Sequence, residues 1–227
     1  MASQHFDLDE QEQLDRIKDF WKRYGNFITW VLIVALAVLG SWMGYKQWQV
    51  RKATEASVLF GAFEQALQEG DETRFKRALE DLGKSYPTTT YTQQAHLQVA
   101  KFRFDKGDLS GAKQELQYVV DNAPDEGYQA IARLRLSGVL VELKDLDAAL
   151  QVLAAEIPAS FAYLVTDRQG DIYALKGNWQ EAKKAYEKAY QLADDTSSYR
   201  PMIEVKMRAL GVEPPSPQPT ASQAKSG

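Results

Sequence analysis

The chain has 227 residues, a formal net charge of −4 at pH 7 and no cysteine. The lack of cysteine excludes a disulfide framework, a cysteine-ligated zinc site and a thiol nucleophile. The slight acidic excess argues against a nucleic-acid-binding protein, because such proteins normally present a basic stripe or patch.

The first predicted element is a membrane-spanning helix. Residues 25–45 read GNFITWVLIVALAVLGSWMGY and include no charged side chain. About 20 apolar residues, at about 1.5 Å of rise each, cross a hydrocarbon layer roughly 30 Å thick. Aromatic residues flank the run on both sides, as expected at headgroup depth: Phe20, Trp21, Tyr24, Tyr45 and Trp48. We therefore predict a transmembrane helix over residues 25–48.

A cleaved signal peptide is the competing interpretation of this segment. The small residues around Ala35 and Ala37 resemble a cleavage site, but apolar sequence continues to Met43. Six acidic residues precede the run, whereas a signal peptide begins with a basic region. A buried helix of a water-soluble domain is disfavoured because the run has no polar face. The pattern favours a retained anchor.

Charges beside the span bear on its orientation. Four basic residues precede it and three follow it: Arg16, Lys18, Lys22 and Arg23, then Lys46, Arg51 and Lys52. Basic residues are enriched on the cytoplasmic side, so the counts marginally favour a short cytoplasmic tail over residues 1–24. Charge alone leaves the orientation open.

The region after the span contains a repeat. Similar segments begin at Lys106, Leu143 and Lys176, and a weaker copy begins at Glu69. Their turn positions, Gly70, Gly107, Lys144 and Gly177, recur at spacings near 34 residues, which is typical of tetratricopeptide arrays with two helices per repeat. The pattern predicts helix pairs over 53–69/72–85, 91–106/109–122, 127–143/146–155 and 160–176/179–193, then a capping helix over 200–210.

Residue chemistry explains this period. Gly107 and Gly177 suit the left-handed conformation that ends a helix, and Asp108, Asp145 and Asn178 are predicted to cap the next one. Ala112, Ala149 and Ala182 recur where paired helices must approach closely, whereas Phe75 takes that place in the first copy.

These elements define an all-α chain in which a single N-terminal transmembrane helix is followed by a tetratricopeptide-like α-solenoid. The repeat domain is predicted over 53–210, and the membrane helix is expected to run on into it because no proline precedes Pro87. Residues 211–227 are rich in proline, serine and glutamine, so a disordered tail is expected.

Motifs of enzymes are lacking: the sequence has no phosphate-binding glycine loop, no His-Glu-x-x-His and no nucleophile elbow. His96 is interpreted as structural because no second histidine accompanies it. Asp167 and Asp171 share a helix face, which we interpret as solvated or facing a partner and not as an acid–base pair. We expect no enzymatic activity, no cofactor, no metal and no small-molecule substrate.

Two binding surfaces are predicted. The inner face of the array is formed by the first helix of each pair, and a groove for a protein segment is expected there: Gln94, Leu97, Lys101, Phe104, Ile131, Leu134, Val141, Leu164, Asp167 and Asp171. Core packing is the alternative for about half of the apolar members. Gly40 and Gly44 form a GxxxG pattern that permits close helix packing in a membrane, although glycine is also common in such helices without this role.

A family resemblance rests on several of these segments together. They are Ile17-Lys18-x-Phe20-Trp21-x-x-x-Gly25, then Tyr45-x-x-Trp48-Gln49, Arg133-Leu-Arg-Leu136 and Asp167-Arg168-x-Gly170-Asp171. In this order the chain resembles the YfgM-like family, the ancillary subunits of the SecYEG translocon, over about residues 8–210. The resemblance implies a bacterial inner-membrane protein with a cytoplasmic N-terminus and a periplasmic repeat domain. It further implies association with the translocon and the periplasmic chaperone PpiD.

Two functions therefore remain as hypotheses. One is a membrane-anchored scaffold of chaperone type that binds protein partners beside the SecYEG channel. The alternative is an assembly factor for another envelope complex, such as a pilus, secretion or cytochrome-maturation system. Only the family resemblance favours the first.

Overall fold

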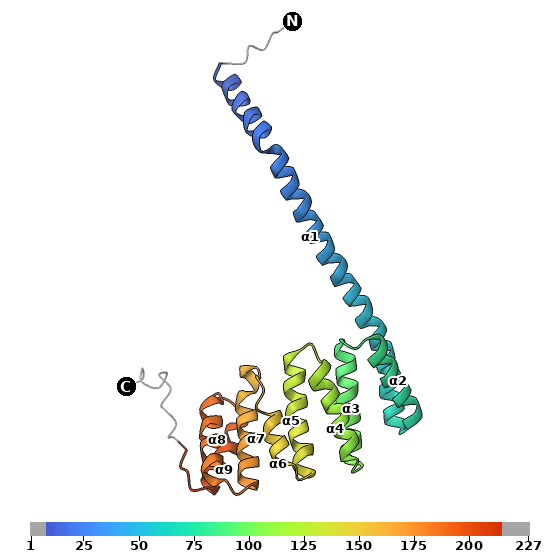
Figure 1. Cartoon of the computed structure of the whole chain (residues 1–227), viewed down its shortest axis with the longest axis vertical. Helices are drawn as coiled ribbons and strands as arrows, with labels where there is room; N and C mark the ends of the chain where they lie inside the picture. Colours follow the sequence, from blue (N-terminus) through green and yellow to red (C-terminus); the bar gives the residue numbers. More distant parts are fainter. Residues whose placement is uncertain (1–7, 215–227) are drawn as a thin grey trace, which may run out of the picture. The chain divides into compact units, whose positions relative to one another are not determined.

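The computed structural model describes residues 8–214, with side chains from residue 16 onward, and every regular element in that range is a helix. The predicted all-α class is confirmed. The chain divides after Glu55 into two units, and helix α1 (Leu8–Glu69) belongs to both. Figure 1 shows the remaining helices following one another in chain order. They are α2 (Glu72–Ser85), α3 (Thr90–Asp105), α4 (Leu109–Asn122), α5 (Glu126–Glu142), α6 (Leu146–Val152), α7 (Ala162–Leu175), α8 (Trp179–Leu192) and α9 (Arg200–Ala209).

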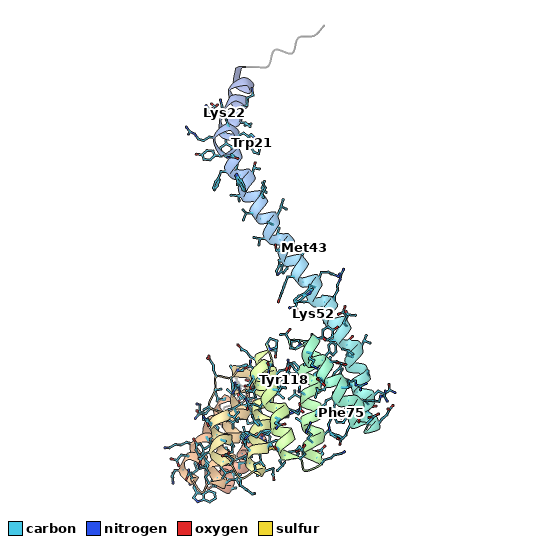
Figure 2. All side chains as sticks on the ribbon, turned by 45° about the vertical axis from the view of Figure 1, so that its right-hand side comes forward. Trp21, Lys22, Met43, Lys52, Phe75 and Tyr118 are labelled. Atoms are coloured by element: carbon cyan, nitrogen blue, oxygen red, sulfur yellow. The ribbon has the colours of Figure 1, made fainter. Side chains whose placement is uncertain are left out.

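The first unit consists of the N-terminal part of α1. Among the described residues its large apolar side chains are exposed: Trp21 and Met43 are 61% and 66% exposed, and Figure 2 shows both projecting from the helix. The expected continuation of this helix into the first repeat is confirmed, since α1 is unbroken to Glu69. Residues 1–7 and 215–227 lie outside the described part, so most of the predicted disordered tail stays a prediction.

The second unit contains the predicted helix pairs, with most ends within two residues of the expected positions. The third pair differs, because α6 ends at Val152 and not at 155. Leu153 and Ala154 donate backbone hydrogen bonds three residues back, to Leu150 and Gln151, which tightens and closes the helix there. A short 3₁₀ helix (Ala159–Phe161) follows Pro158 and leads into α7.

Three small hydrophobic cores hold successive pairs together, as expected for a solenoid whose units contact mainly their neighbours. Ala112, Ala149 and Ala182 are fully buried at the helix contacts where small residues were predicted. Phe75 replaces alanine in the first pair without leaving the core, since its ring meets Phe63 and Phe102 edge to face. The bulky side chain is accommodated because aromatic neighbours surround it.

The predicted caps are present at two of three positions. Asp108 and Asp145 accept hydrogen bonds from the backbone N–H groups of Gly111 and Ala148, at 2.8 and 3.1 Å. The prediction for Asn178 is wrong, because its side chain makes no capping hydrogen bond. The backbone hydrogen bond from Asn178 N to Tyr173 O is kept, as are its equivalents from Asp108 N to Arg103 O and from Asp145 N to Leu140 O.

The turn of the third pair carries backbone strain. Lys144 has a φ of 64°, whereas the equivalent turns use Gly107 and Gly177 at 80° and 75°. A side chain in this left-handed region clashes with the following carbonyl, at a cost of roughly 1–2 kcal/mol. The repeat therefore specifies a glycine conformation that lysine occupies at a penalty.

We predict that Lys144→Gly stabilises the repeat domain by up to about 1 kcal/mol, since the relieved strain exceeds the added chain entropy of glycine. Thermal unfolding of the detergent-solubilised chain, followed by circular dichroism, measures the change. Lys144→Ala is the matched control, because alanine keeps the strained Cβ. Equal melting temperatures for the two variants would contradict the assignment of strain.

Candidate functional site

A pocket of about 420 Å³ lies between the first helices of three successive pairs, α3, α5 and α7. Four predicted groove residues line it: Lys101, Phe104, Leu134 and Val141. Phe104 is 40% exposed although it is aromatic, so part of its ring is available to a partner. The pocket also includes residues that were not predicted for the groove: Ala100, Leu116, Arg135, Gly138, Val139, Glu142 and Arg168.

Three other predicted groove residues lie beside this pocket and are half-buried. Gln94 donates a hydrogen bond from Nε2 to the Tyr128 hydroxyl at 2.8 Å, which joins α3 to α5. Ile131 packs against the core that surrounds Leu136, and Leu164 is partly covered on α7. These residues border the inner face, and a role in partner binding stays a prediction.

Leu97 and Asp167 do not lie on an open groove surface. Leu97 is 6% exposed and belongs to the hydrophobic core of α3 to α7. Asp167 is 1% exposed, and residues near α9 cover it. Leu97 therefore falls under the core-packing alternative for the apolar groove residues. Placing Asp167 at an open groove surface was wrong, because the sequence pattern locates a helix face but not the distant segment that packs onto it.

The interpretation of Asp167 and Asp171 as a solvated or partner-facing pair is also wrong. Lys206 of α9 places its Nζ 2.7 Å from Asp167 Oδ2 and 2.7 Å from Asp171 Oδ1. Tyr199 donates its hydroxyl to Asp167, and Tyr186 donates to Asp171, at 2.8 and 2.9 Å. These five side chains tie α7, α8 and the terminal helix together.

Burial and these hydrogen bonds act on both tyrosines in the same direction. Desolvation, followed by the hydrogen bond to Asp171, raises the pKa of Tyr186 well above its ordinary value. Desolvation and the hydrogen bond to Asp167 raise the pKa of Tyr199 likewise. Both phenols therefore stay protonated at neutral pH and act as hydrogen-bond donors. We name these five side chains the charged clasp.

His96 is buried, as its structural interpretation predicted. Its ring stacks on Tyr118 with centroids 3.7 Å apart, and its Nδ1 lies 2.7 Å from Glu115 Oε2. Arg103 approaches the other oxygen of Glu115 at 3.3 Å. The group joins α3 to α4, and Figure 2 shows Tyr118 within the packed helices.

The second predicted surface lies in the apolar part of α1. Within residues 16–214 the structure contains one helix that is long and apolar enough to cross a membrane, and the chain buries none of its apolar window. Both Gly40 and Gly44 are exposed, and a Cβ built on either one meets nothing within 4 Å. The face that they form is therefore open to another helix. Packing of a partner helix against Gly40 and Gly44 stays a prediction.

Comparison with known proteins gives consistent matches. A family model described as a tetratricopeptide repeat-like domain matches residues 18–212. Three similar proteins are each named an ancillary SecYEG translocon subunit. The protein from Neisseria gonorrhoeae is 35% identical over 207 residues, covering 89% of this chain and 98% of the relative. Those from Escherichia coli and Haemophilus influenzae are 29% and 30% identical and cover 89% and 82% of this chain, and 97% and 91% of their own lengths.

We predict that Lys206→Met loosens the terminal helix, because two carboxylates, one of them buried, then face each other without a cation. Loss of a partly buried pair costs about 2 kcal/mol, so amide hydrogen exchange in α9 should accelerate about 30-fold. Lys188→Met on the exposed side of α8 is the control and should leave exchange unchanged. Equal exchange in both variants would show that Lys206 does not hold α9.

Proposed function

The chain belongs to the family of ancillary SecYEG translocon subunits with a tetratricopeptide repeat-like domain, and we propose that it is a membrane-anchored accessory subunit of that translocon. The observation that carries this proposal is the 35% identity with a relative of that name, over 98% of the relative's length. Such coverage includes both the anchor and the repeats. The proposed activity is protein binding, not catalysis.

For the topology, we propose a cytoplasmic tail over residues 1–24, a transmembrane helix over 25–48 and a periplasmic repeat domain over 53–210. The uncovered apolar window of α1 supports the span. The four basic residues before it and the three after it support the orientation only weakly. An uncleaved anchor of this kind would keep the repeat domain at the inner membrane of a bacterium.

The inner face of the repeats is the proposed binding surface for periplasmic protein partners. Its pocket has an exposed aromatic residue, Phe104, and apolar neighbours such as Leu134 and Val141. Sites of this size and lining suit a bulky apolar side chain. We propose a PpiD-like chaperone or an emerging chain as the occupant, so that the subunit acts as a scaffold or chaperone near the channel.

The proposed topology predicts the behaviour of reporter fusions. An alkaline phosphatase domain fused after Leu210 should be active, because the enzyme matures only outside the cytoplasm. The same domain fused to the N-terminus should be inactive, and immunoblotting controls for equal amounts of both fusions. Activity of the N-terminal fusion alone would reverse the orientation and remove the periplasmic chaperone from the proposal.

The open glycine face predicts a contact with the channel inside the membrane. Gly40→Leu/Gly44→Leu should preserve insertion, because both substitutions add apolar surface, while blocking close helix approach. Co-purification of SecYEG from mild detergent should fall about tenfold, as expected when a packing contact worth about 1.4 kcal/mol is lost.

Val34→Leu/Val38→Leu, on another face of the same helix, is the control and should leave the yield of channel subunits unchanged. Full recovery of the channel with the glycine variant would place the contact in the repeats or the tail. Recovery of pilus, secretion or cytochrome-maturation proteins in place of the channel would favour an assembly factor for another envelope complex.

A further inference from the structure

Gly138 in the middle of α5 has no packing reason within the chain. A Cβ built there meets only Arg168 Nη1, at 4.0 Å. By contrast, a Cβ at Gly170 of α7 would lie 2.5 Å from the Tyr186 ring, so internal packing requires that glycine. Glycine weakens a helix interior relative to alanine, and a Cβ at Gly138 would make only an ordinary van der Waals contact with the Arg168 guanidinium, so no close packing among the described residues requires glycine there.

This space opens into the groove pocket. Gly138 lines the pocket together with Phe104 of α3 and with Leu134 and Val141 of its own helix. The volume of about 420 Å³ lies at the lower end of the range for ligand sites, roughly 300–1,000 Å³. Apolar side chains make up much of the lining, and the Arg168 guanidinium lies at the edge of the space beside the glycine, so the space suits one bulky apolar side chain that approaches the backbone closely.

The charges around the pocket add a second requirement. Arg135 and Arg168 line it, and neither forms an ion pair with a carboxylate among residues 16–214. Lys101 pairs with Asp105 of its own helix, its Nζ lying 2.5 Å from Asp105 Oδ2. Glu142 is the one acidic residue of the lining, so the lining includes two arginine side chains and a single carboxylate. Guanidinium groups bind carboxylates bidentately. A ligand with an acidic group therefore complements Arg135 and Arg168.

From these observations we propose that the pocket beside Gly138 holds a bulky apolar side chain of a partner protein, while an acidic residue next to that side chain binds Arg135 and Arg168. This inference rests on the proposed function, since it names the segment that the repeat groove selects. We infer a protein segment as the occupant, because a polypeptide can present a bulky apolar side chain with a carboxylate directly beside it, which complements the apolar lining and the two arginine side chains.

Covalent trapping tests the proposal on the full chain in detergent. The probe is a fluorescent peptide of serine and glycine with a central benzoylphenylalanine between two glutamates. Irradiation should label residues of α3 and α5, identified by mass spectrometry. A peptide with lysines in place of the glutamates should give about tenfold less adduct, the difference expected for loss of charge-assisted contacts. Equal labelling by both peptides would overturn the acidic specificity.

Gly138→Leu fills the pocket while favouring the helix, so it should lower the adduct yield about tenfold without lowering the melting temperature. Gly61→Leu is the matched control, because Gly61 is an exposed glycine of α1 whose Cβ would also meet nothing within 4 Å. It should label like the wild type. Arg135→Gln/Arg168→Gln tests the two arginine side chains independently. It should reduce the adduct yield of the glutamate peptide to that of the lysine peptide.

Two further outcomes would overturn the proposal. One is undiminished labelling of a folded Gly138→Leu variant. The other is suppression of labelling by vesicles of anionic phospholipid, to the same extent for both peptides, while vesicles of neutral phospholipid have no effect. That result would show that Arg135 and Arg168 bind lipid headgroups. Either failure is distinguishable from failure of the proposed function, because co-purification of SecYEG with the wild-type chain reports on that function separately.

Discussion

An uncharged helical segment whose apolar side chains lie exposed within the described part of the chain is the constraint on which the rest of the structure depends. Residues 25–45 carry no charge, and α1 leaves their apolar side chains exposed. Exposing this much contiguous apolar surface to water is unfavourable, whereas a bilayer accommodates it and the helix satisfies its own backbone hydrogen bonds. Anchoring the chain then confines the repeats to the membrane, where tethering raises their effective concentration toward other anchored partners.

The repeat domain is stable for a different reason, because it is built from local units. Each core joins neighbouring helices. The small, fully buried side chains of Ala112 and Ala182 allow α4 and α8 to lie close to the helices that they pack against. Such an array must protect its ends. The far end is closed by α9, which buries Ile203 and Met207 and places Lys206 against Asp167. The charged clasp thus secures a helix with only a small apolar contact of its own.

Features that depend on neighbouring residues in the sequence were predictable, including the helix pairs, the caps at Asp108 and Asp145, and the left-handed turns. Features that join distant residues were not. Lys206 lies 39 residues from Asp167, and no spacing rule pairs them, so Asp167 was assigned to the groove. Gly138 was not predicted as a groove residue, because its role in the pocket depends on the surrounding side chains of α3, α5 and α7. A glycine in a predicted helix interior was the one available signal, and only the packing around α5 shows that no close contact requires glycine there.

The most direct test of the account is photo-cross-linking in intact membranes from two positions of the full chain. A photoreactive residue replaces Ser41 beside the glycine face or Phe104 in the pocket. The account predicts that position 41 forms adducts with channel subunits, whereas position 104 forms adducts with exported chains or a periplasmic chaperone. Absence of channel adducts at position 41, together with adducts of cytoplasmic proteins at position 104, would contradict both the partner and the orientation.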